Sequence, residues 1–184
     1  MDTEAVLFNK EGFKFVRTTK NQYKLEFSIE NKRIHIANII DFNLIKLIYD
    51  LNGDVYEYVN LQKISDNEAI ITLLMKHFFE DLGLPQRFSY VNMKRYMEGE
   101  NKIVFHSQSI RDHRPPNMPP DSELMNMRNL ICTCNIITPH KADFEVKVIF
   151  DPSMIVPPFA EKMVGMILFK IFKRVKQFIE NVVL

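Results

Sequence analysis

The longest regular pattern in the sequence lies at its C-terminal end, where apolar residues recur at helical spacing. No proline follows Pro158, so nothing interrupts a helix from Phe159 onward. At about 100° per residue, one wide face collects these apolar residues: Val164, Ile167, Leu168, Ile171, Phe172, Val175, Phe178, Ile179 and Val182. The pattern predicts one amphipathic helix of roughly 25 residues, close to 40 Å long, which needs a large concave surface to cover it.

The opposite side of this helix carries Lys162, Lys170, Lys173, Lys176 and Glu180. Met166 and Phe169 interrupt this polar side. Two interpretations stay open for them. They are scattered surface hydrophobes, which are normal on soluble proteins, or they contact a membrane or a partner.

Upstream, polar and apolar residues alternate with the period of two that is typical of half-buried strands. The clearest cases between residues 8 and 37 are 13–18, 23–30 and 33–36, a meander that places His35 on its polar side. Asp41 is a candidate N-cap for a helix from Phe42 to about Leu51. Residues 55–62 fit either a second short helix or an irregular link.

A second set of strands follows, separated by turn residues and loops. Residues 80–85 form a loop with an apolar tip, and residues 111–121, with four prolines, form a long loop rather than a linker. The strands are expected at 58–64, 69–79, 88–97, 103–110, 124–137 and 143–150.

These elements predict an α+β fold with eight or nine antiparallel strands, one or two short internal helices and a long terminal helix. So large a sheet curls because strands twist, and the long helix then fills the curl. A curved sheet around one helix often encloses a cavity, which would be mostly apolar here.

Composition narrows the functional classes. The chain has 184 residues, enough for a single domain over 1–184, and a formal net charge of +1 gives no electrostatic reason to expect nucleic acid. Cys132 and Cys134 are expected as buried thiols in a reducing compartment. No signal peptide or transmembrane run is visible, which favours a cytoplasmic location.

No catalytic or metal-binding motif is present. His106, His113 and His140 are not at metal-ligand spacing, and the sequence has neither a glycine-rich phosphate loop nor a nucleophile elbow. We therefore expect these histidines to be surface residues, and we expect no metal and no cofactor.

The order of elements, the stretch from Gly83 to Phe88, and Asp151-Pro152 followed by Pro157 resemble the START family of lipid transfer domains. The resemblance extends from about Phe13 to Val183 and is strongest in the last hundred residues. It is that of a divergent member, because Met154 stands where the family often has glycine and the chain has no tryptophan. The resemblance implies a helix-grip fold that holds a lipid in a tunnel, lipid transfer or sensing, and no catalysis.

Alignment with the family also implies a set of cavity residues. The ligand-facing row would be Ile71, Leu73, Met75 and His77 on one strand and Phe88, Tyr90, Asn92 and Lys94 on the next, with Ile167 and Ile171 from the helix. A lipid phosphate would meet Lys94 or Arg128. The alternatives are that His77, Tyr90 and Asn92 satisfy one another or face solvent, and that Arg128 points outward.

The mouth of the tunnel would lie between the 79–86 loop and the last helix. Apolar side chains beside lysines suit weak, reversible membrane binding, unless the loop is packed and the helix face is simply solvated. The expected mouth or membrane-contact residues are Phe79, Leu82, Leu84, Met166 and Phe169.

The leading hypothesis is a monomer that takes up a phospholipid or sterol-like lipid, visits membranes transiently and transfers the lipid between them. A second is a small-ligand receptor or cyclase-like enzyme on the same fold. A third is a protein-interaction module whose cavity is filled by side chains.

Overall fold

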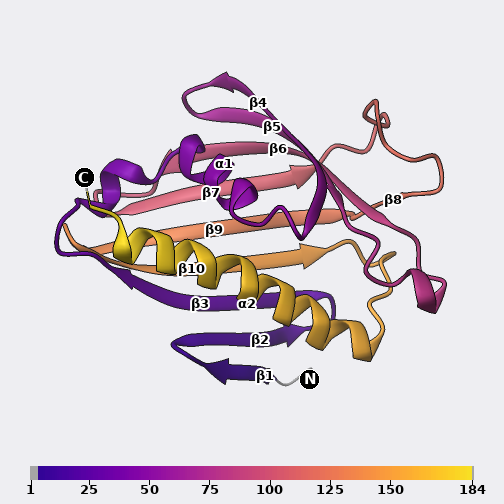
Figure 1. Cartoon of the computed structure of the whole chain (residues 1–184), viewed down its shortest axis with the longest axis horizontal. Helices are drawn as coiled ribbons and strands as arrows, with labels where there is room; N and C mark the ends of the chain where they lie inside the picture. Colours follow the sequence, from indigo (N-terminus) through magenta and orange to yellow (C-terminus); the bar gives the residue numbers. More distant parts are fainter. Residues whose placement is uncertain (1–3, 184) are drawn as a thin grey trace.

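In the computed structural model, which describes residues 4–183, ten strands form one sheet and two α-helices lie against it (Figure 1). The α+β class, the large antiparallel sheet and the long C-terminal helix expected from the sequence are confirmed. The elements are β1 (Ala5–Lys10), β2 (Phe13–Thr19), β3 (Gln22–Glu30), η1 (Ile36–Ile39), α1 (Phe42–Asp50), β4 (Tyr56–Ser65), β5 (Glu68–Met75), η2 (Glu80–Leu82), β6 (Arg87–Met97), β7 (Lys102–Ser109), β8 (Glu123–Leu124), β9 (Met127–Thr138), β10 (Lys141–Phe150) and α2 (Pro158–Asn181).

The strand order is β1-β2-β3-β10-β9-β7-β6-β5-β4, and the sheet does not close. All neighbours along this path are antiparallel, whereas the short β8 pairs in parallel with β6. The two edges are therefore β1 and β4, and β10 and β9 lie near the middle. This order brings the N-terminal meander beside the last strand of the chain.

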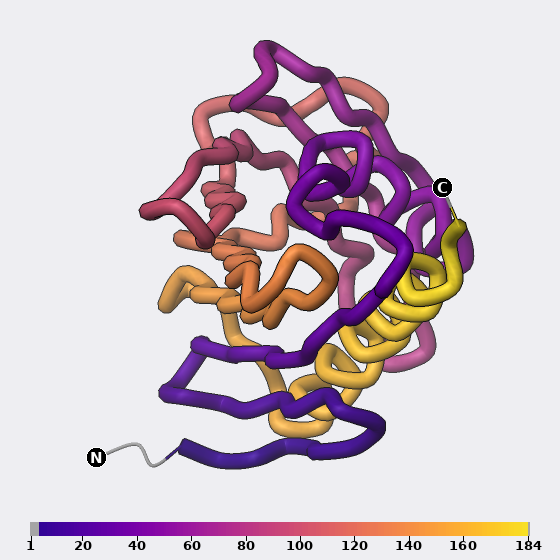
Figure 2. Tube along the Cα trace, turned by 90° about the vertical axis from the view of Figure 1, so that its left-hand side faces the viewer, coloured from indigo at the N-terminus to yellow at the C-terminus, as the bar shows by residue number. Residues whose placement is uncertain are grey.

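Both α-helices lie on one side of the curved sheet, which we call the inner face (Figure 2). Aromatic rings connect the layers: Phe27 stacks on Phe144 across two strands at 5.2 Å and contacts Phe172 of α2 at 5.3 Å. Burial of such large side chains contributes roughly 1.5–3 kcal/mol each as an upper bound. The wide apolar face of α2 thus accounts for much of the core.

The helix α2 begins as the prolines require. Pro157 is the N-cap and Pro158 the first helical residue, where the missing N–H leaves no bond unmade. Gly165 then allows close contact with the sheet, because a Cβ there would lie 2.6 Å from the Phe15 ring.

The prediction that Phe169 is a mouth or membrane-contact residue was wrong. Phe169 was placed on the polar side of α2, but it is only 9% exposed and its ring meets those of Phe8 and Phe13 edge-on at 5.6 and 5.2 Å. The reason is β1, which the alternation did not reveal as a separate strand and which extends the sheet under this side of the helix. Phe169 is a core residue, so it cannot contact a membrane.

Three strand predictions were also wrong in extent. Residues 33–36 turn into η1, because Asn31 donates through Nδ2 to the carbonyls of Ile179 and Val182 and accepts from the Arg33 N–H. The strand expected at 69–79 ends at Met75. The strand expected at 124–137 is divided, with β8 pairing to β6 before β9 begins.

The helix expected from Phe42 is confirmed as α1, and Asp54 in the segment after it is bonded to α2. Asp41 caps α1 by accepting from the backbone N–H groups of Asn43 and Leu44 at 2.8 and 3.1 Å.

After α1, Asp54 accepts hydrogen bonds from Arg174 and Lys170 of α2. These two cations hold the pKa of the Asp54 carboxyl well below its usual range.

This ion pair predicts a pH-dependent contribution to stability. Because the folded-state pKa of Asp54 is lowered, its contribution is present above the unfolded-state pKa of about 4 and is lost as the pH falls further. Asp54→Asn is therefore expected to lower the melting temperature by about 2–4 °C at neutral pH, since partly exposed pairs are worth about 1 kcal/mol at most.

Thermal melts from neutral to strongly acidic pH test this. The difference between the wild type and Asp54→Asn should shrink as the pH drops. Asp66→Asn serves as the control, because Asp66 pairs with Lys63 within one turn and is largely exposed. A difference that stays constant down to strongly acidic pH would contradict the assignment.

Candidate functional site

An apolar pocket of about 120 Å³ lies between the sheet and the beginning of α2. Its walls come from the end of β5 and the following loop, from the start of β6, from Met125 and Phe150, and from the segment leading into α2. Four of its lining residues are polar: Lys76, His77, Gln86 and Arg87. The remainder are Met75, Phe78, Phe79, Leu84, Pro85, Met125, Phe150, Met154, Ile155, Val156, Pro157, Ala160, Val164 and Ile167.

The loop of residues 76–86 closes over this pocket and is braced at its base. The His77 Nε2–H donates to the Leu84 carbonyl at 2.6 Å, and Gln86 Nε2 donates to the Met75 carbonyl at 2.8 Å. Gly83 ends the short helix η2 with φ at 67°, a left-handed conformation that glycine adopts without a Cβ penalty. The loop is therefore a compact flap that is bonded across its own base and joined to the end of β5 at Met75.

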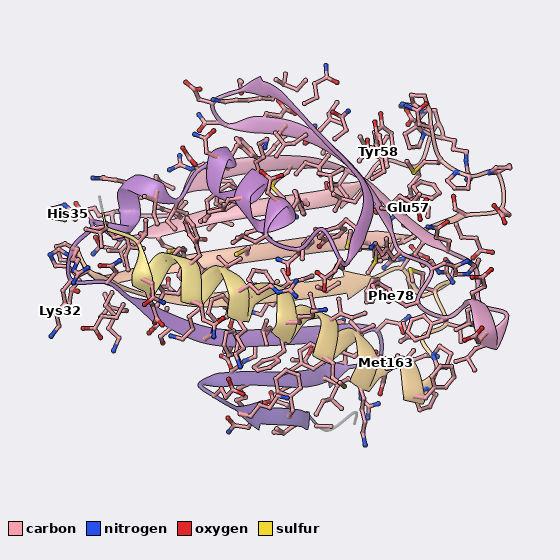
Figure 3. All side chains as sticks on the ribbon, viewed as in Figure 1. Lys32, His35, Glu57, Tyr58, Phe78 and Met163 are labelled. Atoms are coloured by element: carbon pink, nitrogen blue, oxygen red, sulfur yellow. The ribbon has the colours of Figure 1, made fainter. Side chains whose placement is uncertain are left out.

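Exposed apolar side chains lie on the flap and the first turns of α2, at the same end of the molecule as the pocket. Leu82 at the tip of the flap and Met166 on α2 are each 60% exposed, and Ile155 in the segment before α2 is 84% exposed. Phe78 and Met163 lie at the same end of the molecule, where α2 begins (Figure 3). We call Phe78, Leu82, Ile155, Phe159, Met163 and Met166 the apolar rim.

A polar cluster that sequence reasoning missed lies beside the pocket. Arg17 NH1 donates to Glu161 Oε2 at 3.0 Å, and the Tyr23 hydroxyl donates to Glu161 Oε1 at 2.8 Å. Burial and the neighbouring Glu161 carboxylate raise the pKa of Tyr23. Alternation alone placed Arg17 on the same face as Phe13 and Phe15, which was the one signal available. The cluster fastens the first turn of α2 to β2 and β3.

Comparisons with known proteins point to one architecture. No protein-family model and no curated protein matches the sequence, but solved structures match nearly its whole length. Human StAR-related lipid transfer protein 5 is 12% identical, with a TM-score of 0.66 over 96% of this chain and 86% of that one. A STAR-related lipid transfer protein from Xanthomonas axonopodis is 15% identical, with a TM-score of 0.67 over 96% of this chain and 98% of the other.

The lipid transfer and protein localization domain of human StarD13 (DLC2) is similar at 8% identity, with a TM-score of 0.73 over 99% of this chain and 91% of that domain. The fold is that of a START domain. At such low identities the likeness shows the helix-grip architecture and a divergent sequence. The three neighbours are described as lipid transfer proteins or domains rather than as enzymes.

Within this START fold, the prediction of which β6 side chains face the cavity was wrong. Leu73 of β5 lies on the inner face in the main core, but its cross-strand partner is Ser89, and the inner residues of β6 are Val91 and Met93. Tyr90, Asn92 and Lys94 therefore point to the outer face, one residue out of phase with the expected cavity row.

The outer positions have partners of their own. The Tyr90 hydroxyl donates to His113 Nε2 at 2.9 Å, and Asn92 Nδ2 donates to Glu68 Oε1 at 2.7 Å. Phe88 packs outside with Leu74 and Met118, beneath the proline-rich loop. Tyr90, Asn92 and Phe88 therefore lie outside the cavity of the START fold.

Arg128 is likewise outside. It lies at an irregularity in the β9–β10 pairing and donates through Nε to Asp151 Oδ2 at 3.2 Å, with Arg111 a further 3.7 Å neighbour of the same oxygen. Hydrogen bonds from Ser153 and the Arg128 guanidinium lower the pKa of Asp151 to about 2. Arg128 thus anchors the segment that leads into α2 and does not face a buried phosphate.

The other expected residues divide between pocket, core and rim. Met75, His77, Phe79, Leu84 and Ile167 line the pocket. Leu73 and Ile171 are buried in the core of the START fold and line no hollow found among the described residues. Leu82 and Met166 belong to the rim.

A second, smaller hollow of about 20 Å³ lies farther along the inner face, beneath α1 and the C-terminal half of α2. Cys132 and Cys134 line it, and burial raises the pKa of each thiol to about 12, so both are inert at neutral pH. The two cysteines form no disulfide. Over residues 4–183, no helix is long and apolar enough to cross a membrane.

Proposed function

We propose that this protein binds a lipid between the sheet and α2 and transfers it between membranes, without a catalytic step. The observation that carries the proposal is the apolar pocket beneath a braced flap, at the same end of the molecule as the apolar rim. The names of the similar solved structures support it, since they are lipid transfer proteins. Residues 1–184 would act as one monomeric lipid-binding domain in the cytoplasm, visiting membranes transiently and requiring no cofactor.

The pocket must enlarge to admit a lipid. Its volume of about 120 Å³ is below the roughly 300–1,000 Å³ typical of ligand pockets. Three methionines, Met75, Met125 and Met154, line it, and this flexible side chain adapts readily to a changing shape. The flap and the first turns of α2 are the parts whose displacement would open it.

The apolar rim would insert into the membrane surface while the flap opens. Lys76 and Lys162 are exposed nearby and would favour an anionic surface, at about 1 kcal/mol for each lysine close to it. This arrangement gives binding that is weak enough to reverse, which a carrier requires.

Placing charges on the rim is expected to slow transfer without abolishing lipid binding. The double variant Leu82→Asp/Met166→Asp should reduce transfer between anionic vesicles about fivefold, because both side chains are exposed and carboxylates resist insertion. Fluorescent-lipid transfer between donor and acceptor vesicles measures this.

The matched control is Val6→Asp/Ile137→Asp. These two residues are also exposed hydrophobes, but they lie on β1 and β9 and belong neither to the pocket lining nor to the rim. If both double variants transfer lipid at the same rate, the rim is not the membrane-contact surface.

Native mass spectrometry after incubation with a total lipid extract tests the proposed function itself. One bound lipid per chain, together with transfer of that lipid between vesicles, would support a carrier. A bound lipid without transfer would indicate a sensor.

The small volume also favours a second candidate, an interaction module whose cavity is filled by side chains. In that case no lipid would co-purify or exchange, and the apolar rim would mark the surface that a protein partner covers. The extract experiment separates the two candidates.

A further inference from the structure

Ser107 is a buried polar residue whose hydroxyl has no partner. Its side chain is only 1% exposed, and no donor or acceptor in the structure reaches Oγ. Asn126 Oδ1, in the link between β8 and β9, is the other such buried side-chain atom within residues 4–183. Leaving a buried hydroxyl unpaired is costly, so its presence calls for an explanation.

Ser107 lies on the inner face of the sheet, facing the helices. Phe105, two residues before it on β7, is in the main core, and strand alternation puts both side chains on the same face. The cross-strand partners of Ser107 are Met93 of β6 and Leu130 of β9, which also pack in this core. The residues directly opposite Ser107 are uncharged, and the nearest charged side chain on this face, Arg95 opposite Phe105, donates to the Ile40 carbonyl.

The hydroxyl stands between the two hollows of the inner face. On one side, Ser109 Oγ donates to the carbonyl of Met125, which lines the larger pocket. On the other side, Phe105 lines the smaller hollow together with Cys132. Along α2, the nearest residues of the two hollows are Ile167 and Phe172, five residues or about 7.5 Å apart.

Small side-chain movements would join the hollows. Met93 and Leu130 flank Ser107, and methionine changes rotamer at low cost. The joined channel would run beside α2 from about Ala160 to Ile179, roughly 28 Å at 1.5 Å per residue. That length accommodates a long-chain or polycyclic lipid, and the unpaired Ser107 hydroxyl would lie deep inside it.

Resting on the proposed function, we infer that the ligand is an uncharged lipid with a hydroxyl head, which enters first and hydrogen-bonds Ser107 Oγ where the hollows join. A charged head is disfavoured there because no charged side chain lies opposite Ser107, Arg95 on the same face already bonds the Ile40 carbonyl, and burying an unpaired charge is costly. The charged residues that line the pocket, Lys76 and Arg87, belong to its mouth, and Arg87 already bonds Glu123 at 2.8 Å.

Binding of three probes with the same chain length tests this inference. The wild type should bind 1-hexadecanol at least about tenfold more tightly than hexadecyl phosphate, because only the alcohol can place an uncharged head beside Ser107. Ser107→Ala should weaken 1-hexadecanol binding about fivefold and leave hexadecane binding unchanged.

The melting temperature of Ser107→Ala distinguishes a ligand-binding serine from one that stabilises the fold. Without ligand, Ser107→Ala should raise the melting temperature by about 2–4 °C, because it removes an unpaired buried hydroxyl. Thr133→Val is the matched control: Thr133 is also buried, on the neighbouring strand, but pairs with Val104 on the outer face. This control should bind all three probes as the wild type does.

Dehydroergosterol and dioleoylglycerol distinguish a sterol from an acylglycerol as the source of the hydroxyl. The inference is overturned if Ser107→Ala lowers the melting temperature, or if it weakens 1-hexadecanol and hexadecane equally. Preference of the wild type for hexadecyl phosphate or dioleoylphosphatidylcholine would overturn it while the proposed function stands. If no lipid binds, both fail together.

Discussion

Replacing Val164 by tryptophan is expected to abolish lipid binding, with a loss of at least about tenfold in affinity. Val164 is half-buried on α2 and lines the larger pocket, so the added ring would occupy the space that a lipid needs. Because a pocket of about 120 Å³ has room for extra side-chain atoms, the cost in stability should stay near 1 kcal/mol. Function and stability are thus separated at this position.

Titration of the variant with a fluorescent lipid, alongside vesicle transfer, measures the effect. Gln177→Trp is the control, because Gln177 is exposed on the same helix and lines neither hollow. Wild-type lipid affinity in the Val164→Trp variant would show that the ligand lies elsewhere. Loss of binding with a melting temperature lowered by no more than about 4 °C would place it in this pocket.

Gly165→Ala is expected to lower the free energy of unfolding by about 1–3 kcal/mol, although alanine favours helices by about 1 kcal/mol over glycine. A Cβ at this position would lie 2.6 Å from Phe15 Cδ1 and 3.1 Å from Phe8 Cε1. Phe15 is fully buried and stacks on both Phe8 and Tyr23, so its ring cannot move freely.

Urea unfolding followed by circular dichroism measures this change. Gly53→Ala is a matched control, because a Cβ at Gly53 meets nothing within 4 Å and its φ is not positive. The control should differ from the wild type by no more than about 0.5 kcal/mol. A stabilised Gly165→Ala variant would mean that α2 does not approach β2 as closely as described.

The elements with a strong period were predictable, and those defined by tertiary contacts were not. The apolar stripe and paired prolines of α2, and the Asp41 cap of α1, are local signals and were found. In contrast, β1 is six residues long with no clean alternation, and it is ordered by pairing with β2 and by Phe8 packing on Phe15 and Phe169. No local pattern encodes such contacts.

The error on β6 has a physical origin as well. Both faces of this strand carry large apolar residues: Val91 and Met93 face the helices, and Phe88 faces Met118 of the proline-rich loop. Alternation therefore identifies the strand but not its inner side. Of the candidate site, the flap and its apolar tip were predicted, whereas Ser107 was not, because only the fold shows that its hydroxyl has no partner.

The position of α2 in the sequence affects how the protein is made. This helix follows all ten strands along the chain, yet Phe169, Ile171, Val175 and Ile179 are part of the main core. During synthesis the strands leave the ribosome with their apolar inner face uncovered, and the core is completed only after the final helix emerges. A nascent chain that stalls before that point exposes an apolar surface that promotes aggregation.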